Sequence, residues 1–409
     1  MRIALLLAVL LFPSLVVAQT RATVEAQFRG WLEQVVWPQA TRQGVDRSTF
    51  DAAFAGVSLN WDLPDLVPPV MPPPTAQDQR QSEFGAPAKY FNQGSMTGAT
   101  STGRQMAQRH ATTLATVERA TGVPGHIILA IWGRESGYGR ADIPHNVFEV
   151  LGTKGFMSTR APYFTEELVA ALRIAQTGMA PRAMRSSWAG ALGQPQFMPT
   201  NYLTHATDGD GDGRADIWGS EADTIASIGT YLARHGWQGG RDWGFEVTVP
   251  TQVSCALEGP DQGRAIADWA AMGVTRVGGK PFPATELTGA GFLMMPAGRN
   301  GPAFIVTPNF YVLKDYNTSD LYALFVGHVG DRIAYGVGDF AGRWGDVGGL
   351  LRSDVAAIQR GLMAQGFDTG GADGLAGFRT RRSIGLWQAS AGQPPTCFPD
   401  ASLVLALGR

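Results

Sequence analysis

This chain of 409 residues contains little cysteine and has no large excess of positive or negative charge. Cysteine occurs only at Cys255 and Cys397, and neither has a Cys or His neighbour at metal-ligand spacing, which excludes a thiolate metal site. The 33 basic and 35 acidic residues leave a net charge of −2, so the chain lacks the basic surface expected of a nucleic-acid-binding protein. Beyond the N-terminus, no apolar run approaches the length of a transmembrane segment.

The length and the apolar content indicate a folded protein of more than one domain. Apolar residues make up 44% of the chain and charged residues 17%. A chain of this length is long for one hydrophobic core and suits two or three domains.

The N-terminus has the pattern of a secretory signal peptide. Arg2 precedes an apolar run, Ile3 to Val17, which ends in Val16-Val17-Ala18. We therefore expect residues 1–18 to be removed and the mature protein to be soluble and periplasmic; a buried N-terminal helix is the alternative. Because no cysteine follows the cleavage site, we expect no lipoprotein-type lipid anchor. Export would permit a disulfide between Cys255 and Cys397, although two buried free thiols fit the sequence equally well.

Helical patterns dominate the first part of the chain. Apolar residues recur at three- and four-residue steps in the N-terminal region and in four later stretches, followed by a passage with little periodicity. The predicted helical regions are 24–56, 104–121, 126–133, 166–177 and 223–235. A proline-rich segment, 63–87, is expected to be extended. We expect 245–315 to be loops with short strands at Phe245–Val249 and Ala303–Val306, and the glycine-rich stretch 336–349 to separate the last 60 residues.

The strongest local signal is a carboxylate at the end of an apolar helix. Ile128, Ile131 and Glu135 fall on one helical face, and Gly137 and Gly139 follow as helix-ending residues. A carboxyl group placed there loses hydration, so its pKa should rise towards the value that a general acid needs near neutral pH. The alternative is that Glu135 turns outward and pairs with a neighbouring arginine, Arg134 or Arg140.

A second segment, 187–199, combines small residues with polar ones in apolar surroundings. Its sequence is Ser-Trp-Ala-Gly-Ala-Leu-Gly-Gln-Pro-Gln-Phe-Met-Pro. The small residues allow close backbone approach, and the polar side chains of Ser187 and Gln196 need partners that a sugar can supply. Taken alone, the segment also fits a tightly packed loop without a binding role.

Together these segments resemble the B family of lytic murein transglycosylases. Further matching positions are Arg160 to Phe164, Tyr231 ahead of His235-Gly236-Trp237, and Tyr316-Asn317. The resemblance extends over roughly residues 20–340 and implies a lysozyme-like catalytic domain, with its core at about 104–240. It implies that Glu135 protonates the bond between N-acetylmuramic acid and N-acetylglucosamine and then acts as a base, leaving a 1,6-anhydro end. It also implies substrate-binding roles for Ser187, Gln196, Tyr231, Tyr316, Asn317 and Arg160.

A third motif has oxygen-bearing residues at alternate positions. Asp208, Asp210 and Asp212 precede Gly213, as at the start of an EF-hand loop, but the twelfth position is Gly219 instead of a glutamate. The family has an EF-hand-like calcium loop with a later last ligand, so the resemblance implies a structural Ca²⁺ held by Asp208, Asp210, Asp212, Arg214 and Asp223. A solvated Asp/Gly turn is the alternative.

The last residues form a self-contained apolar pattern. Val355, Ile358 and Leu362 lie on one helical face, and Ile384 and Trp387 form a second step. Residues 350–409 resemble a small helical peptidoglycan-binding domain, and the binding role follows from the resemblance alone.

The combined interpretation is a mainly α-helical, exported lytic transglycosylase. It has a lysozyme-like catalytic region over 19–340 with small loop and β insertions, and a peptidoglycan-binding domain over 350–409. Its partners are the glycan strands of peptidoglycan, no cofactor is required for the chemistry, and the sequence identifies no protein partner. Two alternatives remain open: a hydrolytic muramidase on the same fold, and a non-catalytic peptidoglycan-binding scaffold.

Overall fold

The computed structural model describes residues 12–69, 87–345 and 349–408, with side chains from residue 21 onward. Residues 1–11 of the expected signal peptide and most of the proline-rich segment lie outside these ranges. None of the helices in the described ranges combines the length and apolarity needed to span a membrane. The chain divides into two compact units: residues 1–75 with 139–227, and residues 76–138 with 228–409. We call them unit 1 and unit 2.

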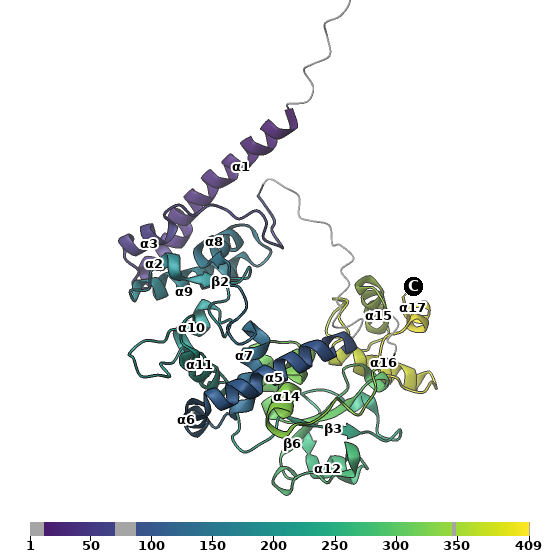
Figure 1. The fold of residues 1–409 in the computed structure, drawn as a ribbon. Coiled ribbons are helices and arrows are strands. Elements are labelled where there is room, and N and C mark those ends of the chain that lie inside the picture. Colours follow the sequence, from purple (N-terminus) through teal and green to yellow (C-terminus); the bar gives the residue numbers. More distant parts are fainter. Residues whose placement is uncertain (1–11, 70–86, 346–348, 409) are drawn as a thin grey trace, which may run out of the picture. The chain divides into compact units, whose positions relative to one another are not determined.

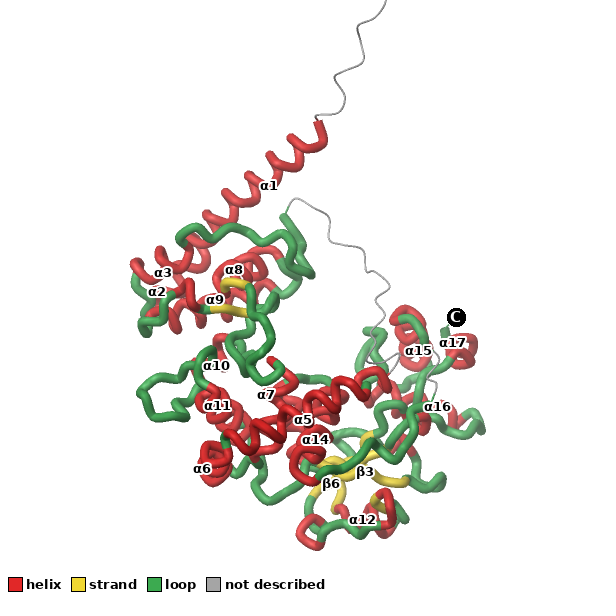
Figure 2. Tube along the Cα trace, in the orientation of Figure 1, coloured by secondary structure: helices red, strands yellow, loops and turns green. Residues whose placement is uncertain are grey.

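Unit 1 is helical (Figures 1 and 2). Its N-terminal helices enclose α8 and α9 through a series of aromatic contacts, such as Phe28 against Phe156 and Phe54 against Phe148. The helix α8 is buried along nearly its whole length because apolar residues occur on all its faces. The elements of unit 1 are α1 (Phe12–Trp31), a π-helical turn (Leu32–Val36), α2 (Trp37–Arg42), α3 (Arg47–Phe54), β1 (His145–Asn146), α8 (Val147–Met157), α9 (Ala161–Gln176), a 3₁₀ turn (Pro181–Ala183), β2 (Arg185–Ser186), α10 (Pro199–His205) and the first half of α11 (Glu221–Arg234). The strands β1 and β2 pair antiparallel.

In unit 2, the helix α7 (Gly125–Ser136) lies inside a group of helices. It packs against α5 (Gln93–Arg109), α6 (Ala111–Thr121) and α14 (Asp320–Tyr335). Ile128, Ile131 and Trp132 have no exposed surface, as the apolar composition of α7 predicts. The remaining helical elements near this group are a 3₁₀ turn (Pro87–Phe91) and α13 (Pro308–Tyr316).

Unit 2 also contains an antiparallel sheet of five strands in the order β4-β6-β7-β3-β5, drawn in yellow in Figure 2. The strands are β3 (Gly244–Thr248), β4 (Arg264–Ala265), β5 (Thr275–Arg276), β6 (Ala290–Met294) and β7 (Ala303–Val306). They are joined by the helix α12 (Ile266–Ala271) and 3₁₀ turns at Cys255–Leu257, Val277–Gly279, Ala284–Glu286 and Gly298–Asn300. The two strands predicted from sequence correspond to β3 and β7, whereas the edge strands β4 and β5 are too short to show an alternating pattern.

The C-terminal helices α15 (Arg352–Ala364), α16 (Phe378–Ser390) and α17 (Ala401–Leu407) gather around Ile358, Leu362 and Ile384 (Figure 1). They belong to the same compact unit as the sheet. A disulfide joins Cys255 to Cys397, which settles the choice between a bridge and two free thiols. The boundary near residue 350 stays a prediction.

The mainly helical fold is confirmed, but the single helix predicted over 104–121 is wrong. The chain has two helices there, α5 and α6, which meet at His110. The buried positions Gly103, Met106, Leu114 and Val117 keep one helical phase across the break. The apolar periodicity therefore contains no signal that a helix ends at His110.

Candidate active site

Glu135 lies in the last turn of α7, and the residues around it fix where that helix ends. Gly137 has a left-handed backbone (φ 57°) and donates its N–H to the Gly133 carbonyl. The following residue, Tyr138, returns its ring to the helix: a Cβ atom on Gly133 would lie 2.6 Å from that ring. Gly137 thus ends α7 one residue after Glu135, and Tyr138 packs back against the last turn.

The carboxylate of Glu135 faces α14. Its Oε1 accepts a hydrogen bond of 2.6 Å from the hydroxyl of Tyr322, whose side chain is buried. Burial raises the pKa of Glu135 from its ordinary value of 4.5 to about 7, while the Tyr322 hydroxyl and Arg134 oppose this rise. Arg134 itself donates to the Tyr90 hydroxyl at 2.8 Å and lies over the Phe325 ring. The inward orientation of Glu135 is therefore the one observed.

Three tyrosines from different elements lie together at this carboxylate. The rings of Tyr316 and Tyr322 are nearly parallel with centroids 6.4 Å apart, and Tyr231 of α11 meets Tyr316 edge to face at 4.7 Å. Burial, and then the nearby Glu135, raises the pKa of both Tyr316 and Tyr322 well above the ordinary value. Tyr231 donates its hydroxyl to the Asp315 carbonyl at 2.7 Å. Tyr322, which remains protonated, donates its hydroxyl to Glu135 and thereby favours the ionised form of that carboxyl group.

Unit 2 thus brings together three of the residues predicted from sequence: Glu135, Tyr231 and Tyr316. The fourth, Asn317, directly follows Tyr316, is exposed, and accepts a hydrogen bond from the Ser319 amide at 3.1 Å.

Ser187 and Gln196 lie in unit 1, in a loop closed by bridges between Ser186, Leu192 and Phe197. The Ser187 hydroxyl accepts hydrogen bonds from the Ala189 and Ala191 amides, and the Gln196 side chain donates to the Gly193 carbonyl at 2.8 Å. Gln196 has a left-handed backbone, φ 54°, a strained conformation for a residue with a side chain. Both side chains therefore organise the loop, and their binding roles remain predictions.

Arg160 also belongs to unit 1, at the start of α9. Its guanidinium lies over the Tyr163 ring, 4.4 Å from the centroid, and over Phe164 at 5.6 Å. Stacking of this kind holds the cation beside apolar surface while it keeps donors for an anionic group.

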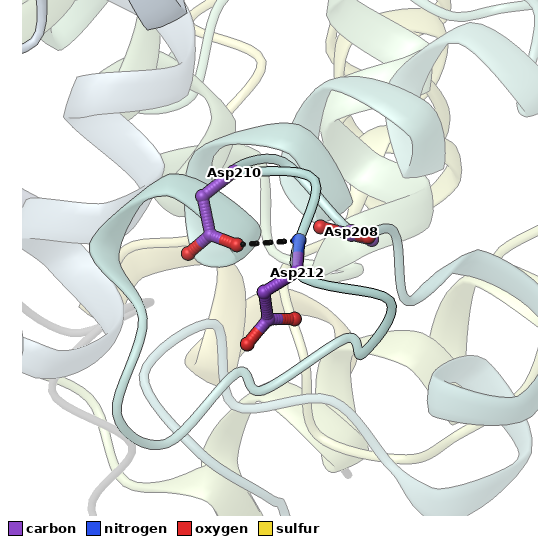
Figure 3. A group of neighbouring side chains, drawn as sticks. All are labelled: Asp208, Asp210 and Asp212. Carbon is purple, nitrogen blue, oxygen red and sulfur yellow. Dashed lines mark hydrogen bonds between the residues drawn. The ribbon is translucent and has the colours of Figure 1, made fainter.

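The acidic loop of unit 1 brings three carboxylates close together. Asp208, Asp210 and Asp212 each offer one oxygen within 4.8 Å of the others, and all three are exposed. Figure 3 shows the three side chains and the hydrogen bond of 3.2 Å from the Asp212 amide to Asp210. Amides of Gly213 and Gly211 donate to Asp208 and lower its pKa. Three hard oxygen donors in a tight loop fit Ca²⁺.

Both carboxylate oxygens of Asp223 are already engaged by backbone amides of the loop. One of its oxygens accepts from the Gly209 amide at 2.8 Å and the other from the Asp216 amide at 2.6 Å. The buried carboxylate thereby ties the two ends of the loop together. Arg214 donates its amide to Asp212 at 2.8 Å, which bends the loop at the position where an EF-hand uses a carbonyl.

Sequence reasoning missed Tyr322, the direct partner of Glu135. It lies in the apolar run Leu321-Tyr322-Ala323-Leu324-Phe325-Val326. A hydroxyl inside such a run needs a buried partner, and this is the signal that could have identified it.

The chain belongs to the Transglycosylase SLT domain family, which its residues 27–331 match. Among curated proteins, it is 33% identical over 215 residues to the membrane-bound lytic murein transglycosylase B of Escherichia coli (strain K12). That match spans 52% of this chain and 58% of the relative, little more than half of either.

Solved structures match over more of the chain. SltB3 from Pseudomonas aeruginosa, in complex with NAG-NAM-pentapeptide, is 36% identical with a TM-score of 0.83, covering 93% of this chain and 99% of that one. The Escherichia coli lytic transglycosylase Slt35, in complex with calcium, is 27% identical with a TM-score of 0.53, covering 63% and 80%.

Proposed function

We propose that this protein is a lytic transglycosylase that cleaves peptidoglycan between N-acetylmuramic acid and N-acetylglucosamine, with Glu135 as the acid/base. The observation that carries the proposal is the Glu135 carboxyl group, which is partly buried at the end of α7 and has a pKa of about 7. A group with this pKa can give up and recover a proton near neutral pH. The family, and the NAG-NAM-pentapeptide bound by SltB3, support the substrate class.

The proposed reaction needs one carboxyl group. Protonated Glu135 donates its proton to the glycosidic oxygen as the bond to C1 of the muramic acid breaks. The resulting carboxylate then takes the proton from the 6-hydroxyl of the same sugar, whose oxygen bonds to C1 and closes the 1,6-anhydro ring. Because the nucleophile is part of the substrate, its effective concentration is high. Among the described residues, the groups that shift the pKa of Glu135 are Tyr322 and Arg134, and no second carboxylate is among them.

We assign the substrate-binding roles as follows. In unit 2, Tyr316 lies beside Glu135 and the exposed Asn317 follows it, so these two residues can contact a sugar. Tyr231, which is 4% exposed, packs edge to face against Tyr316 and supports its ring. In unit 1, the stacked Arg160 suits an anionic group of the muramyl side, and the loop of Ser187 and Gln196 supplies backbone and side-chain polar groups.

Digestion of purified peptidoglycan sacculi tests the function. Mass spectrometry should find anhydro products, lighter by one water than the products of a hydrolytic muramidase. Glu135→Gln should lower the rate by about a hundredfold or more. The matched control is Asp331→Asn, which alters another partly buried carboxyl group whose pKa is raised, to about 8. Hydrated products would favour the muramidase, and equal binding without any products would favour a scaffold.

We further propose that Asp208, Asp210 and Asp212 hold a structural calcium ion, as the calcium complex of Slt35 suggests. Added Ca²⁺ should then raise the melting temperature through mass action on the folded state. Asp210→Ala should abolish this rise, whereas Asp261→Ala, which alters an aspartate outside the loop, should keep it. An unchanged melting temperature in the parent protein would favour a plain turn.

The C-terminal helices are proposed to bind the cell wall, and the protein to act in the periplasm after removal of residues 1–18. Fractionation of cells and N-terminal sequencing test the export. Co-sedimentation of the Glu135→Gln protein with sacculi tests binding without cleavage. Substituting exposed residues such as Leu386 and Met363 should weaken sedimentation if these helices are the anchor.

A further inference from the structure

A buried arginine connects the C-terminal helices to two carboxylates elsewhere in unit 2. Arg381 of α16 is 1% exposed and donates two hydrogen bonds to Glu258, of 3.0 and 2.5 Å. It donates a third to Asp320 at 3.3 Å and a fourth to the Ala376 carbonyl at 2.7 Å. Every nitrogen of the guanidinium has a partner, as a buried charge requires.

Asp320 is the first residue of α14, and its second oxygen is also used. Lys314 of α13 donates to Oδ1 of Asp320 at 2.6 Å, while Arg381 donates to Oδ2. The lysine precedes the turn of residues 317–319 and the aspartate follows it. The pair therefore closes this turn at its base, and Arg381 holds the pair from a position 61 residues further along the chain.

The same turn determines where the tyrosines of the active site lie. Tyr316 comes two residues after Lys314, and Tyr322 comes two residues after Asp320. The Ser319 hydroxyl accepts from the Tyr322 amide at 3.1 Å and caps α14, and the Tyr322 hydroxyl donates to Glu135. A displacement of Asp320 would therefore be transmitted through one helical turn to the hydrogen bond of Glu135.

We propose that Arg381 is a positioning residue for the active site: through Asp320 it fixes the turn between α13 and α14 so that Tyr322 keeps its hydrogen bond to Glu135. This role rests on the proposed function, which makes Glu135 the acid/base. It also makes the C-terminal helices part of the catalytic machinery and not only a connection to the cell wall.

Other contacts already attach these helices to the sheet region, so attachment alone does not explain the bond to Asp320. Arg382, the next residue, forms an ion pair with Asp261 and donates to the Glu258 carbonyl. The disulfide joins Cys397 to Cys255. Neither contact reaches the turn of residues 317–319, and this difference supplies a matched control.

The test is a charge-balanced double variant, Arg381→Gln with Glu258→Gln. It removes one positive and one negative charge, keeps the Lys314–Asp320 pair, and takes from Asp320 only its arginine. The control, Arg382→Gln with Asp261→Asn, removes the neighbouring ion pair between the same two segments and also keeps the net charge. The measurement is the pH dependence of kcat and KM on a soluble glycan of alternating N-acetylglucosamine and N-acetylmuramic acid.

If the proposal holds, the first variant loses about tenfold in kcat with little change in KM. The alkaline limb of its kcat–pH profile moves to higher pH. The groups that face Glu135 are then Arg134, Tyr316 and a less well placed Tyr322, and a weaker bond from Tyr322 lowers the pKa of Glu135 less. The control should match the parent protein. A folded double variant with the parent's kcat and pH profile overturns the proposal. If the double variant does not fold, Asp320→Asn is measured instead, since it keeps the Arg381–Glu258 pair. An unchanged kcat and pH profile in that variant overturns the proposal.

The proposed function can fail separately. Titration of the Glu135 carboxyl carbon by NMR, assigned by comparison with Glu135→Gln, reports the Tyr322 hydrogen bond without any turnover. A parent protein that forms no anhydro product refutes the transglycosylase. A Glu135 titration that is identical in the double variant and the parent protein refutes the positioning role.

Discussion

Removing the hydroxyl of Tyr322 should change the pH at which the enzyme works. Tyr322→Phe keeps the buried ring but deletes the donor that lies 2.6 Å from Glu135. A hydrogen bond to a charged group contributes about 1.5–3 kcal/mol, and about 1.4 kcal/mol corresponds to one pH unit. Because the bond favours the ionised carboxylate, its loss should raise the pKa of Glu135 from about 7 by roughly one to two pH units.

The sign follows from the proposed role of Glu135. A general acid must be protonated before it reacts, so kcat/KM is high below the pKa and falls as the pH rises through it. The parent protein should lose activity around pH 7, and Tyr322→Phe should remain active to a higher pH. At pH 5 both carry a protonated acid, and their rates should differ by about tenfold or less through lost orientation.

The assay is the initial rate of anhydro product formation on a soluble glycan from pH 5 to pH 9. Tyr335→Phe is the control, since Tyr335 lies on the same helix but is 69% exposed. An alkaline limb that stays in place, or moves to lower pH, in a folded Tyr322→Phe protein would refute the proposed effect of this hydrogen bond.

Three further predictions concern stability. The pKa of Glu135 is raised from 4.5 to about 7 in the folded state, so the burial of this residue becomes unfavourable as the pH rises through that range. Glu135→Gln should therefore increase the free energy of unfolding by about 3 kcal/mol at pH 8 and by little at pH 4. Urea denaturation at the two pH values measures the difference. Gly133→Ala places a methyl group against the ring of Tyr138 and should lower the melting temperature with a loss of about 1–3 kcal/mol, whereas Gly98→Ala, in open space on α5, should not. Replacing both Cys255 and Cys397 by serine should lower the free energy of unfolding by about 2–5 kcal/mol, since the bridge spans 142 residues. A parent protein whose stability is unaffected by reductant would contradict this.

The helix α7, which carries the proposed acid/base, could be predicted from the sequence because its signals are local. The apolar stripe of Ile128 and Ile131, and the glycine that ends the helix, lie within a few residues of Glu135. The inward orientation of the carboxylate could not be decided in this way. It depends on Tyr322, which is 187 residues away and whose hydroxyl reaches Glu135 only after α7 and α14 have packed.

Long-range contacts also limited what could be predicted for the sheet and the acidic loop. The edge strands β4 and β5 have two residues each, so their pairing with β6 and β3 defines them and their own pattern does not. The spacing of Asp208, Asp210 and Asp212 predicted a cluster of oxygens, which the structure contains. Spacing alone did not indicate that both oxygens of Asp223 bind backbone amides of the loop.

The bond from Arg381 to Asp320 has a consequence for the order of events during synthesis. A ribosome delivers Glu135 and Tyr322 long before it delivers Arg381, so a partly made chain contains the proposed acid/base and its hydrogen-bond partner while Glu258 and Asp320 still lack the arginine. Asp320 then keeps Lys314, but Glu258, which is 1% exposed, has no cation, and an unpaired buried carboxylate resists packing. A nascent or truncated chain that ends before α16 should therefore be protease-sensitive and weakly active. The proposed activity would in this way depend on synthesis of the whole chain, because it requires the last helices.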